Sequence, residues 1–374
     1  MTESSSIGGA RPSKLLGLEI VRFTCAMAVL VWHFQHFAMA GDGNAMQQPH
    51  EPLAMMFWPF YQFGRFGVQV FWCISGFIFY WKYGEAIAAR LVAPRRFFWL
   101  RFSRLYPLHF VTLLIVAALQ PIYTAMAGSP FVYADNGIRN FLLHLALADQ
   151  WSGIHDYSFN GPIWSVSAEV FIYLLFFLAL RIFGRSPWLI VGAIGIALTS
   201  MATGMVSPAL ICGGYFFAGG AAAEFMNSAR ARRRPGQAIA LALAWIAAAV
   251  AAAMVVGLRP TGLMMPIWLM AICPPLLFLA ARDLPALDRW QAPIQAAGNL
   301  TYSTYLIHFP LQLTIAIAAI AGGFALPVGQ PWFLLAYLGA TLVLGRLVYV
   351  GFEAPAQRLI RAATLTRESE RAAA

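Results

Sequence analysis

Residues 15–39 read LLGLEIVRFTCAMAVLVWHFQHFAM, and this stretch decides the class of fold. It is apolar over the length that a helix needs to cross a bilayer, about 20 residues. Ala38-Met39-Ala40-Gly41 at its end resembles the cleavage site of a signal peptide. The apolar run from Leu15 to Trp32 is longer than the core of a typical signal peptide, and Glu19 and Arg22 interrupt it. We therefore expect an uncleaved first membrane helix.

The composition of the whole chain extends this expectation. Of the 374 residues, 60% are hydrophobic and 11% are charged, and the mean hydropathy is +0.68. An ordinary globular domain carries roughly 25% charged residues. Too little polar surface is present to wrap a water-soluble core of this size, so lipid must solvate much of the chain.

Further apolar spans follow along the chain, each bounded by charges, glycine or proline. They predict an all-α fold, a polytopic integral membrane bundle of about ten transmembrane helices. The expected spans are 15–39, 65–83, 105–126, 163–183, 187–203, 207–226, 236–257, 264–281, 298–321 and 331–352. We expect one transmembrane domain over 15–356, between cytoplasmic segments at 1–14 and 357–374.

The loop charges give an independent test of this count. Twenty of the 25 lysines and arginines fall at the termini and in alternate loops, against three in the intervening loops. Cytoplasmic loops carry such an excess, which predicts a multi-pass membrane protein with both termini in the cytoplasm. The formal net charge of +10 then reflects loops that face anionic membrane lipids, and it argues against nucleic acid as a partner.

Two outer loops, 40–64 and 127–162, are long enough to take part in recognition. The second contains Asp135, Asp149, Asp156, Trp151 and Tyr157, residue types that suit a sugar. Its stretch from Ile138 to Ala148 is too short to span a bilayer and is expected to form a re-entrant or interfacial helix.

Ionisable residues inside the expected spans are the strongest functional signal. Each costs about 2.5–3.5 kcal/mol to insert, so by default it indicates function, although a polar pair that only joins helices is the alternative. Arg22 and His33 share one face of the first helix, with His33 nearer the outer surface. Glu169 lies six residues inside the outer end of the antiparallel span 163–183. His33 and Glu169 are therefore expected at similar depth, as an acid/base pair.

A second signal lies where the span 105–126 begins. Arg101 and Arg104 are three residues apart and would point the same way on a helix. Such a fork suits a phosphate of a cytosolic cofactor, whereas an ordinary cytoplasmic anchor is the alternative. The four cysteines form no CxxC pair and predict neither a disulfide framework nor a metal site. The chain also lacks GxSxG, P-loop and HExxH motifs.

Five stretches together resemble acyltransferase family 3, a family of membrane-bound O-acyltransferases. The stretches are LLGLEIVR at 15–22 with Trp32-His33, FGVQVFWCISGF at 66–77, RFSRLYP at 101–107, WSVSAE at 164–169 and YSTYLIH at 302–308. They occur in order over about 15–356. Gln69 stands where the family more often has Asp, and Ala168 where it has Val.

The resemblance implies transfer of an acyl group, usually acetyl, from cytosolic acyl-CoA to a hydroxyl of an extracytoplasmic carbohydrate or glycolipid. It implies His33 as base or acyl carrier supported by Glu169, with Arg101 and Arg104 holding the phosphates of the acyl-CoA. The expected supporting residues are Arg22, His308, Ser165 and Tyr305. Acyl-CoA is the expected donor, a saccharide or glycolipid the expected acceptor, and no metal is expected. A membrane transporter or exporter of a saccharide or small metabolite, using the same buried charges, is the alternative.

Overall fold

The structure, a computed structural model, describes residues 15–39, 51–151, 157–257, 262 and 264–366. These residues are helical and contain no strand, which confirms the all-α prediction. Eight of the helical runs are long and apolar enough to cross a membrane, and two shorter apolar helices, α9 and α13, accompany them. The described residues thus contain the ten helices that the sequence predicts.

The bounds of the helices follow the expected order. The apolar ones are α1 (Leu16–His33), α3 (Ala54–Phe63) continuing into α4 (Gly67–Phe79) and α5 (Glu85–Ala88), α6 (Pro94–Ala127), α8 (Trp164–Phe183), α9 (Pro187–Thr203), α10 (Pro208–Asn227), α12 (Pro235–Val256), α13 (Met264–Ala280), α14 (Gln291–Gly322) and α15 (Pro331–Val348). The short ones are α2 (His36–Met39), α7 (Ile138–Leu145), α11 (Ala229–Arg233) and α16 (Ala354–Arg361). The short helix predicted at 138–148 is confirmed as α7.

Proline and glycine set many of these bounds. Six α-helices, among them α6 and α15, have proline in their first turn, where its missing N–H would have no partner anyway. Several end at a glycine with positive φ, such as Gly128 at 78° and Gly323 at 65°, a conformation that closes a helix without strain. Local sequence therefore decides where many helices begin and end.

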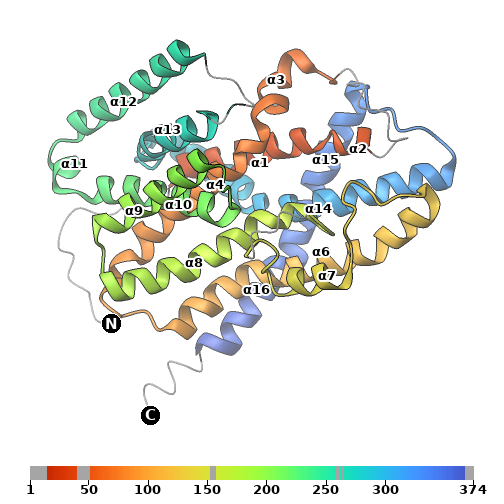
Figure 1. Cartoon of the computed structure of the whole chain (residues 1–374), viewed down its shortest axis with the longest axis horizontal. Coiled ribbons are helices and arrows are strands. Elements are labelled where there is room, and N and C mark those ends of the chain that lie inside the picture. Colours follow the sequence, from red (N-terminus) through yellow and green to blue (C-terminus); the bar gives the residue numbers. More distant parts are fainter. Residues whose placement is uncertain (1–14, 40–50, 152–156, 258–261, 263, 367–374) are drawn as a thin grey trace.

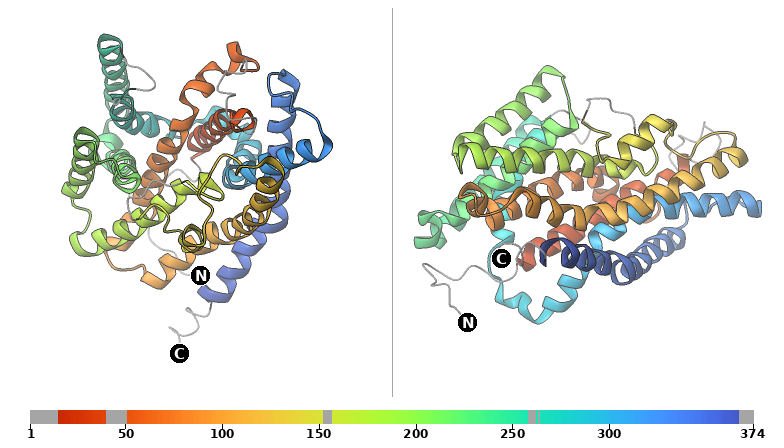
Figure 2. Two further views of the ribbon diagram at one scale, coloured as in Figure 1. Left: turned by 45° about the vertical axis from the view of Figure 1, so that its right-hand side comes forward. Right: turned by 90° about the horizontal axis from the view of Figure 1, so that it is seen from below.

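The helices run mostly along the long axis of the molecule, as Figure 1 and the right-hand view of Figure 2 show. α12 stands at the edge of the bundle in Figure 1 and packs against α13. Most of its side chains face outward, and only Ala238 and Ala242 are buried. A helix with an apolar surface and so little buried area fits a position in contact with lipid.

Three predicted starts were wrong, and the span predicted at 298 begins at Gln291. The span predicted at 65 begins at Ala54, because the 3₁₀ turn Gly64–Phe66 joins α3 directly to α4. A Cβ on Gly64 would lie 2.2 Å from the backbone oxygen of Ala28, so this glycine allows α1 to approach. The span predicted at 105 begins at Pro94, since arginines are good helix formers and continue α6 beyond its apolar part.

The closest helix contact joins α4 and α10. A Cβ on Gly76 would lie 1.7 Å from the backbone oxygen of Phe216, and one on Gly219 would lie 1.8 Å from that of Cys73. The two backbones therefore touch, with no side chain between them. Membrane helices associate through such small residues, because lipid provides no hydrophobic force that would drive them together.

Substitution of Gly76 by Ala should destabilise the bundle. The added methyl overlaps the α10 backbone, and overpacking of this kind typically costs about 1–3 kcal/mol. Thermal unfolding of the detergent-purified protein should show a lower midpoint, or the yield of monodisperse protein should fall.

Gly339→Ala is the matched control, because a Cβ on Gly339 in α15 meets nothing within 4 Å. Equal stability of the two variants would contradict the assigned α4–α10 contact.

Candidate functional site

Three histidines pack together where α1, α2 and α14 meet. The ring centroid of His33 lies 4.8 Å from that of His36 and 4.8 Å from that of His308. All three side chains are buried. α1 ends at His33, and the turn at Phe34 and Gln35 brings His36 back beside it. The end of α1 therefore brings His36 next to His33, the candidate catalytic residue.

Gln312, which the sequence analysis did not single out, joins two of these histidines. Its Nε2 donates to the backbone oxygen of His33 at 2.8 Å, and its Oε1 lies 3.1 Å from Nδ1 of His36. A carbonyl oxygen can only accept, so the amide orientation is fixed and Nδ1 of His36 must donate. Gln312 lies one turn after His308 on the same face of α14. A glutamine in an apolar span was the feature of the sequence that could have indicated this residue.

The same reasoning assigns the tautomer of His308. Its Nδ1 lies 2.6 Å from the backbone oxygen of Tyr305 and must carry the hydrogen. In the neutral ring the lone pair is then on Nε2, which is buried and has no hydrogen-bond partner. A buried imidazole nitrogen with a free lone pair, beside the ring of His33, is chemically a base.

Ser165 and Tyr305, two of the predicted supporting residues, lie beside this cluster. Their hydroxyls are 2.8 Å apart, and the hydroxyl of Tyr305 also donates to the backbone oxygen of Pro162 at 2.6 Å. The Tyr305 ring centroid lies 5.9 Å from that of His308. These bonds tie α14 to the start of α8 and hold the histidine cluster in place.

Glu169 does not form the predicted pair with His33. No hydrogen bond joins the two residues, and the side chains that act on His33 are the other two histidines. The Glu169 carboxylate instead faces the hydroxyls of Ser75 and Tyr173 and feels the charges of Arg101 and Arg22. Its Oε1 is buried without a hydrogen-bond partner. The sequence predicted the depth of each residue in the membrane but not the rotation of each helix about its axis. That rotation decides which neighbours a side chain contacts.

Arg22 also lies away from the histidines. It forms an ion pair with Glu19 at 3.0 Å and donates to the hydroxyl of Thr301 at 3.3 Å. A Cβ on Gly298 would lie 1.8 Å from Oε2 of Glu19, so the glycine gives the carboxylate room against α14. Arg22 therefore links α1 to α14 at Thr301, away from His33.

Arg101 and Arg104 both lie in the basic first part of α6. Arg101 donates to the hydroxyl of Tyr83 at 3.1 Å, and its guanidinium lies 4.8 Å from the ring centroid of Phe79. Its Nε is buried without a partner. The charge of Arg104 acts on Tyr302 and Glu353, and Glu353 in turn accepts a hydrogen bond from Ser303 at 2.5 Å. Stacking on aromatic rings leaves an arginine's donors available for a further anion.

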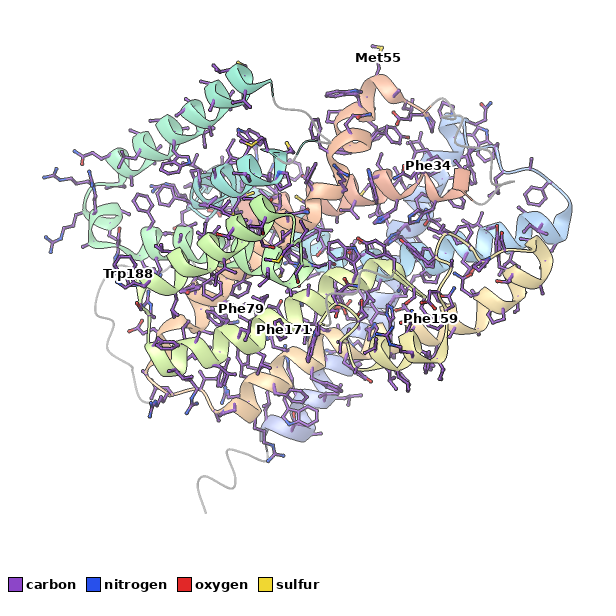
Figure 3. All side chains as sticks on the ribbon, viewed as in Figure 1. Phe34, Met55, Phe79, Phe159, Phe171 and Trp188 are labelled. Carbon is purple, nitrogen blue, oxygen red and sulfur yellow. The ribbon has the colours of Figure 1, made fainter. Side chains whose placement is uncertain are left out.

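The two groups lie at different positions along the molecule. In Figure 3 the labelled Phe79, under Arg101, is in the left half, whereas Phe34, next to His33, is in the right half. Tyr302 lies between them: its hydroxyl donates to the backbone oxygen of Leu105, next to Arg104, at 2.6 Å, and His308 follows it on α14. Polar side chains thus follow one another through the bundle from the arginines to the histidines. Within the described residues, no group of three His, Cys, Asp or Glu side chains is placed to hold a metal ion.

The described part of the loop 127–162 reaches the histidine cluster through aromatic rings. Ring centroids lie 5.8 Å apart between His36 and Tyr133, 6.1 Å between Tyr133 and Tyr157, and 5.9 Å between Tyr157 and Trp164. Tyr157 is exposed. The row therefore leads from the surface to His36.

Asp149, a predicted sugar-binding residue of this loop, is buried instead, and Asp156 lies outside the described residues. The Asp149 carboxylate accepts a hydrogen bond from Gln150 at 3.1 Å. It belongs to a separate polar group in which Nε2 of His109 donates to the backbone oxygen of His144 at 2.7 Å. Burial lowers the pKa of His144, and the nearby Asp149 only partly opposes this. The bond between His109 and His144 holds α7 on α6.

The comparisons with known proteins agree with one another. A family model described as an acyltransferase domain matches residues 15–350. The chain is 29% identical over 185 residues to a protein named acyltransferase MdmB from Streptomyces mycarofaciens. That alignment covers 47% of this chain and 42% of the relative, so it spans less than half of either protein. No solved structure matches.

Substitution of Gln312 by Leu should destabilise the histidine cluster. It leaves Nδ1 of His36 and the backbone oxygen of His33 without partners, and a buried polar group left unpaired typically costs about 1–3 kcal/mol. Thermal unfolding in detergent should show a lower midpoint than for the wild type.

Gln330→Leu is the control, since Gln330 is exposed and its side chain makes no capping bond at the start of α15. If Gln312→Leu unfolded at the wild-type temperature, the bridging hydrogen bonds would not be present.

Proposed function

The chain belongs to the acyltransferase family whose domain model matches residues 15–350, and on this premise we propose that it transfers an acyl group from cytosolic acyl-CoA to an extracytoplasmic hydroxyl. The observation that carries the proposal is the row of polar side chains on α14, in which Tyr302 contacts α6 beside Arg104, Tyr305 lies beside His308, and His308 lies beside His33. A donor held at one membrane face can thereby reach an acceptor that arrives from the other.

The donor would enter along the arginines. Arg101 and Arg104 would bind its phosphates, because a guanidinium makes strong charge-assisted hydrogen bonds to phosphate oxygens. The pantetheine arm carries two amide N–H groups that need acceptors inside the bundle. Oε1 of Glu169 is a buried acceptor without a partner, between the arginines and the histidines, so we assign Glu169 to the arm and not to His33.

The thioester carbon would then lie beside His33. In the direct route, His33 takes the proton of the acceptor hydroxyl, the oxygen attacks the thioester carbon, the C–S bond breaks, and the proton passes to the CoA thiolate. In the covalent route, a nitrogen of His33 attacks the thioester carbon, the C–S bond breaks, and CoA leaves as the thiolate. The acceptor oxygen then attacks the acyl carbon, the C–N bond breaks to free His33, and a second base takes the hydroxyl proton and passes it to the thiolate. His308 supplies that base in Nε2, whose lone pair is free because Nδ1 is bonded to Tyr305.

The acceptor would approach along the aromatic row of Tyr133, Tyr157 and Trp164. Flat aromatic rings pack against the C–H face of a sugar, while their polar atoms bond its hydroxyls. We therefore propose a saccharide or glycolipid acceptor and, in keeping with the family resemblance, acetyl as the acyl group. In keeping with the family resemblance, we propose a multi-pass protein of the cell inner (plasma) membrane, and the loop charges predict that this side faces outward.

Substitution of His33 by Ala should abolish transfer without loss of folded protein. Removal of a general base or nucleophile typically lowers a rate by about 100-fold or more. The measurement is release of free CoA from acetyl-CoA by purified protein, with hydroxylamine as a small surrogate acceptor.

His109→Gln serves as the matched control, because glutamine keeps a donor to the backbone oxygen of His144 outside the site. Retained activity in His33→Ala would overturn the assignment of His33. A wild-type protein that moves a saccharide across vesicles yet never consumes acetyl-CoA would be a transporter.

Replacing both Arg101 and Arg104 by Gln should weaken acetyl-CoA binding. Each lost charge-assisted hydrogen bond is worth about 1.5–3 kcal/mol, so the Kd should rise at least about tenfold. Calorimetry on detergent-purified protein measures this directly.

Arg95→Gln with Arg96→Gln removes the same charge from the same helix and is the control. Equal affinity of both double variants for acetyl-CoA would leave Arg101 and Arg104 as an ordinary cytoplasmic anchor.

A further inference from the structure

A third arginine joins Arg101 and Arg104 from the far end of the chain. α16 packs against α6, as both views in Figure 2 allow the reader to follow. Arg361, the last residue of α16, donates through Nε to the hydroxyl of Ser103 at 3.1 Å. Ser103 lies between the two donor arginines in sequence. The family match ends at residue 350, so Arg361 lies beyond it.

The three guanidinium groups are close enough to repel one another. The positive charges of both Arg101 and Arg104 act on Arg361. The ion pairs Arg22 with Glu19 and Arg185 with Glu224 include none of these three arginines. The carboxylates of Glu169 and Glu353 act on Arg101 and Arg104 and offset part of the positive charge. Like charges held together in this way are stabilised by a bound polyanion.

The arrangement of the three arginines suits the three phosphates of CoA. Arg101 and Arg104 lie one turn apart on α6. Arg361 reaches the same turn from another helix, α16, through its hydrogen bond to Ser103. The two linked phosphates of the diphosphate suit the two neighbouring arginines of α6. The separate 3′-phosphate on the ribose suits the arginine that comes from α16.

We propose that Arg361 completes the donor site and binds the 3′-phosphate of CoA, while Arg101 and Arg104 bind the diphosphate. This assignment rests on the proposed use of acyl-CoA. Through Arg361, α16 would distinguish CoA from nucleotides that lack the 3′-phosphate. Glutamine at position 361 keeps a donor for Ser103 but removes the charge.

The test compares acetyl-CoA with acetyl-dephospho-CoA, which lacks only the 3′-phosphate, by calorimetry on the full-length protein. The wild type should bind acetyl-CoA about tenfold more tightly than the dephospho form, as expected for one charge-assisted contact. Arg361→Gln should lose this preference while keeping its affinity for acetyl-dephospho-CoA. Arg361→Lys, which retains the charge, should keep part of the preference.

Arg358→Gln is the control, because Arg358 is an exposed arginine on the same helix, and it should leave both affinities unchanged. An equal loss of both affinities in Arg361→Gln, or no loss of either, would overturn the assignment of the 3′-phosphate. If the wild type bound neither ligand, the proposed donor itself would be wrong, and the role of Arg361 would fall with it.

Discussion

The backbone contact between α4 and α10 at Gly76 and Gly219 is the constraint on which the interior depends. With no side chain between the two helices, neither can rotate or slide without a clash. α4 in turn carries Ser75, which faces Glu169, and Phe79, over which Arg101 lies. The position of the buried acid and of the first donor arginine therefore follows from a contact between two glycines and the opposite backbone.

The buried polar groups divide into those that are satisfied and those that are not. Arg22 is paired with Glu19, and Gln312 makes two hydrogen bonds. Oε1 of Glu169, Nε of Arg101 and Nε2 of His308 have none. Unpaired buried polar atoms are costly, so they are rare except where a ligand completes them. These three lie along the proposed path of a donor with phosphates, amides and a reactive thioester, whereas others, such as Oδ1 of Asp149 and Nδ1 of His144, lie away from it.

The sequence and the structure differ most at Glu169. Its depth in the membrane could be counted from the helix end, and so could that of His33. Similar depth does not make two residues neighbours, because helices at the same level can present them in different directions. The histidine cluster shows the reverse case: His308 and Gln312 lie far along the chain from His33, and only the packing of α14 on α1 brings them together.

The sequence by itself determined the membrane helices, most of their bounds, the predicted orientation and the motif residues. These depend on hydropathy, charge distribution, proline and glycine, all of which act locally along the chain. Only the tertiary structure decided that α3 and α4 form one span, that Gln312 bridges two histidines, and that Arg361 reaches Ser103. Those outcomes depend on the rotation of each helix about its own axis and on its lateral neighbours. Close packing between helices fixes both, and a one-dimensional pattern does not contain them.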